Sequence, residues 1–240
     1  MGHRTLARSR RALRGRPRDR RGFAGVMPFS AVGVALTVAG TAAALVAARA
    51  KRPFAYGAAK TAASAGFVVV ALASVGRAHG GLPSTLVLAG LVTAAVSDVA
   101  LAFPGRKGLV AGMGGFALAH ALAGSGFAIR AGFGWLGWGI ALGAIGGAAV
   151  RRWLRERAKG ALGVAAGAYA CVALAMATAA CGAGAATHAW QLGAGAALVV
   201  GSDLAVAAER FFGRGIRAKA VGLPAYYAGQ LLVAFGIAAL

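Results

Sequence analysis

Two aspartates carry the most informative chemistry in this chain. Asp98 and Asp203 lie near the ends of long apolar stretches, in the similar sequences Ser-Asp-Val-Ala and Ser-Asp-Leu-Ala. An ionisable group inside a membrane segment is costly, so it usually faces the protein interior and has a function. Two carboxyl groups that share one site can hold a single proton between them and act as an acid and a base. We predict that Asp98 and Asp203 face the interior of the bundle and form a functional site.

Each aspartate also has a purely structural alternative. A protonated carboxyl group can hydrogen-bond a neighbouring helix, and an ionised one can pair with a base such as Lys60. Further polar residues lie in apolar surroundings: His120, Tyr169, Tyr226, Tyr227 and Gln230. Each of them has either a role in packing and interhelical hydrogen bonding or a role in the functional site. Tyr226 and Gln230 are four residues apart and share a helix face.

The two aspartates belong to an internal repeat. They are 105 residues apart, and a basic loop and another apolar stretch follow each of them. This spacing covers four apolar stretches, and an even number per repeat gives parallel halves that are related by an axis along the membrane normal. We expect the halves to cover about 27–130 and 131–240. Both aspartates then lie at the same depth, roughly 8 Å inside one boundary.

The composition is that of a membrane protein. Of 240 residues, 59% are hydrophobic and 13% are charged, and the mean hydropathy is +0.72. Soluble domains are about 25% charged, and a nucleic-acid-binding protein carries its basic face on a folded soluble unit, for which no stretch is long enough. A membrane helix needs about 20 apolar residues, and eight stretches qualify. They are approximately 28–48, 56–76, 82–103, 108–129, 134–150, 160–181, 188–208 and 219–240.

These stretches predict an all-α bundle of about eight transmembrane helices. Without water in the bilayer, backbone groups must be satisfied within each helix. Gly139, Gly143 and Gly147 recur every fourth residue, a spacing that lets helix backbones approach closely. We expect a pocket between the third, fourth, seventh and eighth helices to collect Asp98, His120, Asp203, Tyr226 and Gln230.

The basic residues predict the orientation. The odd-numbered loops hold Arg49, Lys51, Arg52, Arg106, Lys107, Arg151, Arg152, Arg155, Arg157, Lys159, Arg210, Arg214 and Arg217, whereas the even-numbered loops hold only Arg77 and Arg130. Short loops rich in Lys and Arg stay in the cytoplasm. We therefore expect a multi-pass protein of the cell (inner) membrane, with cytoplasmic odd-numbered loops and both termini outside.

Residues 1–26 contradict this orientation. They contain nine of the arginines, which favour a cytoplasmic N-terminus. Either Met27 is the true start and the leader is not translated, or the leader is a real disordered tail and the helix count differs. We expect a leader over 1–26 and a single membrane domain over 27–240.

No metal site is predicted. Cys171 and Cys181 are ten residues apart, about 15 Å along a helix, which is beyond disulfide reach. The four His and two Cys residues show no spacing typical of metal ligands.

Three motifs, in this order, resemble the YhhN family. The first runs from Ala89 through the Ser-Asp motif to Phe103 and continues, after basic residues, with Gly-Met-Gly-Gly-Phe-Ala-Leu-Ala-His ending at His120. The second is Gly-Ser-Asp-Leu-Ala around Asp203, followed by Arg210. The third is the closing Tyr-Tyr-Ala-Gly-Gln, which ends at Gln230. The resemblance covers the chain from about residue 30 to its end.

The resemblance implies lysoplasmalogenase activity. The animal members of this family hydrolyse the vinyl-ether bond of lysoplasmenyl phospholipids to a fatty aldehyde and a glycerophospho-alcohol. A vinyl ether reacts with acid, so one protonated and one ionised carboxyl group suffice, and no metal, cofactor or nucleophilic Ser or Cys is required. The resemblance therefore implies that Asp98 and Asp203 are the catalytic acid/base pair, without assigning the acid. It also makes the following residues candidates for positioning the substrate: His120, Tyr226, Tyr227, Gln230 and Lys60. The partners are then a lysophospholipid substrate and the bilayer. Lys60, Arg106 and Arg210 are candidates for binding the lipid phosphate. The alternative from another class is a small proton- or cation-coupled transporter that uses the same aspartates.

Overall fold

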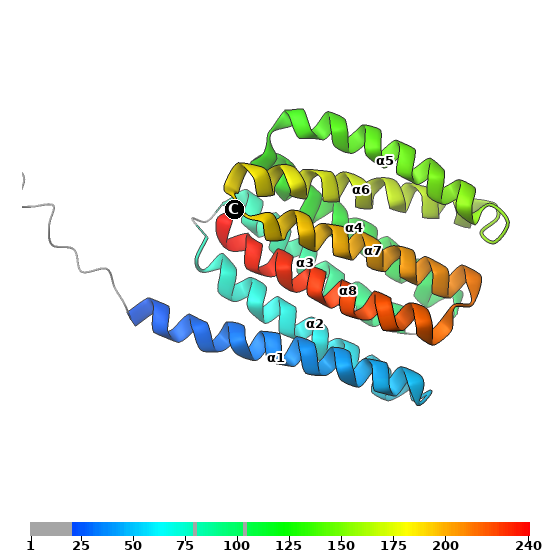
Figure 1. Ribbon diagram of the computed structural model, residues 1–240, viewed down its shortest axis with the longest axis horizontal. Coiled ribbons are helices and arrows are strands. Elements are labelled where there is room, and N and C mark those ends of the chain that lie inside the picture. Colours follow the sequence, from blue (N-terminus) through cyan, green and yellow to red (C-terminus); the bar gives the residue numbers. More distant parts are fainter. Residues whose placement is uncertain (1–20, 79–80, 103–104) are drawn as a thin grey trace, which may run out of the picture.

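The protein is an all-α bundle of eight long helices, here described from a computed structural model (Figure 1). The structure describes residues 21–78, 81–102 and 105–240. The helices are α1 (Arg21–Arg49), α2 (Pro53–Val75), α3 (Leu82–Ala102), α4 (Arg106–Ala131), α5 (Phe133–Leu154), α6 (Ala161–Thr187), α7 (Trp190–Phe212) and α8 (Gly215–Gly236), and a short 3-10 helix, Ile237–Ala239, follows. Within those ranges there is no strand, so the predicted fold class is confirmed.

Seven helices of the described part are long and apolar enough to cross a membrane. They are α1 to α4 and α6 to α8, and α1 qualifies from Phe29 onward. Each of the eight predicted stretches corresponds to one helix. The fifth, which was predicted to be the shortest, continues to Leu154 and so includes Arg151 and Arg152, but α5 is not among the seven. A multi-pass membrane bundle is therefore confirmed.

The two halves of the chain pack alike, as the repeat predicts. The hairpins α1–α2 and α3–α4 correspond to α5–α6 and α7–α8. Between hairpins, α2 packs against α3 and α8, while α6 packs against α7 and α4. Each helix thus has the neighbours that its repeat partner has, which is the pattern of an approximate two-fold axis. Asp98 on α3 and Asp203 on α7 are related by this pattern.

Small residues allow the predicted close approach of helices. A Cβ atom on Gly143 would lie 2.7 Å from the carbonyl oxygen of Cys171, and one on Gly147 would lie 2.6 Å from that of Gly167. Both distances are shorter than any real Cβ contact. The face of α5 that carries these glycines therefore packs directly on the backbone of α6, as small residues at this spacing favour.

The basic loops gather at one end of the bundle. Figure 1 shows the α1–α2, α5–α6 and α7–α8 turns at the same end, with the C-terminus at the other. Which end faces the cytoplasm stays a prediction. Residues 21–26, the last part of the expected leader, form the first turns of helix α1. Residues 1–20 lie outside the described residues. The status of the leader therefore also stays a prediction.

Candidate active site

A cavity of about 290 Å³ has lining residues close to the basic loops, among them Leu154, Arg210 and Lys219. Its polar lining includes Asp98, Asp203, Lys60, Tyr169 and Tyr226, and most of the remaining wall is apolar side chains from α4 to α8. The prediction of a pocket between α3, α4, α7 and α8 alone therefore named too few helices. The helices α2, α5 and α6 also line the cavity, because the two-fold packing brings α2 and α6 against the aspartate-bearing helices.

Asp98 is held by three neighbouring side chains. Lys60 Nζ lies 2.8 Å from Asp98 Oδ1, and only about a twentieth of each side chain is exposed. Ser64 donates a hydrogen bond of 3.0 Å to Asp98 Oδ2, and Tyr227 donates one of 2.5 Å to the same oxygen. A buried ion pair needs such additional hydrogen bonds to offset the loss of hydration. The structural alternative in which Lys60 pairs with an aspartate is thus realised at Asp98.

Asp203 has no comparable partners. Its Oδ2 atom is buried without a hydrogen bond and lies 3.8 Å from His120 Nε2. The Tyr169 hydroxyl group interacts with the same carboxyl group. Among the described residues no Lys or Arg side chain lies within 4.0 Å of Asp203. One of the two carboxyl groups therefore has a cation beside it, and the other has a free oxygen atom.

The partners of the two carboxyl groups come from corresponding helices. Asp98 is contacted by Lys60 from α2 and Tyr227 from α8. Asp203 is contacted by Tyr169 from α6 and His120 from α4. Since α2 and α6 are repeat partners, as are α8 and α4, the two sites share one framework. They differ in charge, because a lysine contacts one carboxyl group and a tyrosine contacts the other.

Aromatic side chains pack beside the two sites. Tyr226 interacts electrostatically with both carboxyl groups, and its hydroxyl group donates to the Ala94 carbonyl oxygen at 3.4 Å. Its ring packs edge-on against Phe67 and Phe116, with centroids 6.1 and 5.7 Å away. These rings give the polar groups an apolar surrounding that keeps them in place.

The other predicted positioning residues lie at different distances from the cavity. Tyr227 is buried behind Asp98 and does not line the cavity. His120 and Gln230 line a second, small cavity of about 30 Å³. Of the phosphate candidates, Arg210 lines the main cavity, whereas the side chain of Arg106 lies outside the described residues.

Sequence reasoning assigned no role to four side chains that contact an aspartate or line the cavity. Ser64 follows Lys60 by four residues, so shared helix-face spacing was an available signal. Tyr169 stood out only as a polar residue in an apolar stretch. Glu209 and Lys219 form an ion pair of 2.6 Å across the α7–α8 turn. Their pairing depends on how tightly that turn closes.

Comparison with known proteins gives one match. The model of the YhhN family matches residues 57–237, well over half of the chain, and this range includes both aspartates and Lys60. No curated protein and no solved structure matches.

Proposed function

The chain belongs to the YhhN family, and from this membership and the cavity we propose that it hydrolyses the vinyl-ether bond of lysoplasmenyl phospholipids. The products are a fatty aldehyde and a glycerophospho-alcohol. The protein is a multi-pass membrane protein of this family. The observation that carries this proposal is that two equivalent carboxyl groups line one cavity and that, among the described residues, a lysine contacts only one of them.

The reaction begins with proton transfer to carbon. In our assignment the Asp203 carboxyl group gives its proton to the outer alkene carbon, which turns the vinyl ether into an oxocarbenium ion. Asp203 suits this role because its Oδ2 atom is unoccupied and no Lys or Arg side chain among the described residues pairs with it. General acid–base assistance of this kind contributes about 10²–10⁴ in rate.

Asp98 takes the complementary role. As a carboxylate at the cavity wall, it stabilises the positive charge that develops on the ether oxygen and its carbon. Lys60, Ser64 and Tyr227 fix its position, so little reorganisation is needed when that charge appears. Lys60 and Tyr227 thereby act through Asp98 as positioning residues.

Water completes the reaction. A water molecule adds to the oxocarbenium carbon and returns a proton to Asp203, which forms a hemiacetal and restores the acid. The hemiacetal then loses its glycerol oxygen, which takes the hydroxyl proton, and the aldehyde is released. All atoms come from substrate and water.

A deuterium experiment tests this sequence of steps. Purified protein would be incubated with lysoplasmenylethanolamine in D₂O, and the aldehyde would be reduced at once to the alcohol for mass spectrometry. Protonation at carbon places one solvent deuterium on the carbon next to the aldehyde carbon. Folded protein that yields no aldehyde, or aldehyde without this deuterium, would contradict the proposal.

A further inference from the structure

A second group of charged residues lies at the partly exposed end of the cavity. Glu209 near the end of α7 and Lys219 in α8 form an ion pair of 2.6 Å, and about a fifth of each side chain is exposed. Both residues line the cavity, together with Arg210 and Tyr56. We call Tyr56, Glu209, Arg210 and Lys219 the mouth cluster.

Tyr56 connects the mouth cluster to the interior. The centroid of the Tyr56 ring lies 4.8 Å from Lys219 Nζ and 5.5 Å from Lys60 Nζ. The ring is thus shared by the lysine of the buried Asp98 pair and the lysine of the partly exposed Glu209 pair. A ligand that enters past the mouth cluster meets charges of both signs before it reaches the two aspartates.

Arg210 has an unused donor. One of its terminal nitrogens donates to the Leu101 carbonyl oxygen at 2.9 Å, which anchors the side chain to α3. Its Nε atom is buried and has no hydrogen-bond partner. A buried donor without a partner is costly, and an arginine that keeps one open is suited to an anion.

We propose that the mouth cluster binds a zwitterionic phosphoethanolamine-type head group. Arg210 and Lys219 would hold the phosphate, while Glu209 and the face of Tyr56 would hold the ammonium group. A carboxylate and an ammonium group that lie 2.6 Å apart present both charges that a zwitterion can pair with. Phosphate favours arginine donors, and an ammonium group favours a carboxylate or an aromatic face.

The spacing along α7 agrees with this assignment. Arg210 lies seven residues after Asp203, about 10 Å along the helix. Both residues line the same cavity. A phosphate at Arg210 therefore leaves the three-carbon glycerol backbone to extend toward the two aspartates, with the alkyl chain beyond them against the apolar wall. The identity of the lipid rests on the proposed function, but its binding does not require turnover.

Binding of uncleavable lipids tests the head-group site directly. The probes are saturated alkyl-ether lysolipids of one chain length that carry phosphoethanolamine, phosphate alone, or no head group beyond glycerol. We expect the phosphoethanolamine lipid to bind most tightly and the alkylglycerol to bind most weakly to the wild type. Equal affinity for all three lipids would overturn the proposal.

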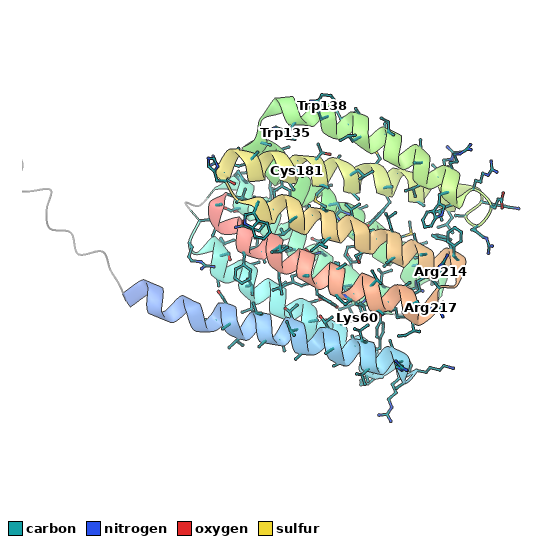
Figure 2. The ribbon with its side chains drawn as sticks, viewed as in Figure 1. Lys60, Trp135, Trp138, Cys181, Arg214 and Arg217 are labelled. Atoms are coloured by element: carbon teal, nitrogen blue, oxygen red, sulfur yellow. The ribbon has the colours of Figure 1, made fainter. Side chains whose placement is uncertain are left out.

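Three variants assign the contacts. Arg210→Met should weaken binding of both phosphate-bearing lipids by about tenfold, the value of one charge-assisted hydrogen bond, and leave alkylglycerol unaffected. Glu209→Gln should remove the preference for phosphoethanolamine over phosphate alone. The matched control is Arg214→Met, because Arg214 lies at the same end of the bundle, exposed and outside the cavity (Figure 2). An equal loss of binding in Arg214→Met would show general charge attraction and overturn the site.

The two proposals can fail separately. Thermal melting in detergent identifies any variant that does not fold, and Arg210→Lys, which keeps the charge, then replaces Arg210→Met. Head-group selectivity without aldehyde release from the vinyl-ether lipid would contradict the hydrolase and leave the head-group site standing. Aldehyde release that does not depend on the head group would contradict the head-group site alone.

Discussion

Lys60 Nζ lies 2.8 Å from Asp98 Oδ1 inside the bundle, where only about a twentieth of either side chain is exposed. The corresponding carboxyl group in the other half of the repeat, that of Asp203, faces His120 and Tyr169 instead. The two halves of the repeat thus differ. Asp98 has a lysine counter-charge beside it, and Asp203 has no Lys or Arg partner among the described residues, although both carboxyl groups line the same cavity. Figure 2 places Lys60 toward the end of the bundle that carries Arg214 and Arg217.

The Lys60–Asp98 pair predicts a large loss of stability when one partner alone is removed. Asp98→Asn leaves a buried lysine without its counter-charge, and breaking a buried pair in this way costs about 3–5 kcal/mol. The double variant Lys60→Met/Asp98→Asn should recover most of the melting temperature in detergent, because no charge remains unpaired. It should not recover aldehyde release. A double variant no more stable than Asp98→Asn would show that the pair contributes little.

Tyr227 and Tyr226 are adjacent but should differ in their effect on stability. Tyr227 donates a 2.5 Å hydrogen bond to Asp98, whereas Tyr226 donates a 3.4 Å hydrogen bond to a backbone carbonyl group. A hydrogen bond to a charged group contributes about 1.5–3 kcal/mol. Tyr227→Phe should therefore lower the melting temperature more than Tyr226→Phe does. The opposite order would place the structural role on the cavity-lining tyrosine.

Close helix packing predicts a contrast between two glycines of α7. A Cβ atom on Gly195 would lie 2.7 Å from the backbone carbonyl oxygen of Gly229 on α8, while one on Gly201 would meet nothing within 4 Å. Gly195→Ala should lower the melting temperature because the backbone of α8 must move. Gly201→Ala is the matched control and should raise it slightly, since alanine favours the helix by about 1 kcal/mol. Equal effects of the two variants would contradict this packing of α7 against α8.

The orientation in the membrane is predicted from the basic loops. In a background with Cys171→Ala and Cys181→Ala, single cysteines would replace Glu156 in the α5–α6 loop and Arg77 after α2, both of which are exposed. In intact cells a membrane-impermeant maleimide should label Arg77→Cys and leave Glu156→Cys unlabelled. Labelling of Glu156→Cys alone would show the opposite orientation and contradict the prediction.

The positions of the eight helices, and the presence of the two aspartates in one interior site, could be predicted from the sequence. Helix positions follow from the length of each apolar stretch, and the aspartates follow from their cost in a bilayer and from the repeated Ser-Asp motif. The partners of each carboxyl group could not be predicted. They depend on which helices the two-fold packing brings together, and that packing placed Lys60 and Tyr227 at Asp98 but Tyr169 and His120 at Asp203.

The arrangement of the mouth cluster could not be predicted from the sequence either. Its members come from α2, α7 and α8, and spacing along the chain does not place Tyr56 beside Lys219. The family resemblance named Arg210, and not Arg214, as a phosphate candidate, but it did not indicate which side chains lie beside Arg210. The structure shows that Arg210 lines the cavity and that Arg214 does not.

The most direct test of the central claim compares aldehyde release by the wild type and by Asp203→Asn. Purified proteins of equal melting temperature would be incubated with lysoplasmenylethanolamine, and the aldehyde would be trapped and quantified. The wild type should release aldehyde, and Asp203→Asn should be slower by about 10² or more, because asparagine cannot donate the proton. Full activity of Asp203→Asn, or no aldehyde from folded wild type, would contradict the account.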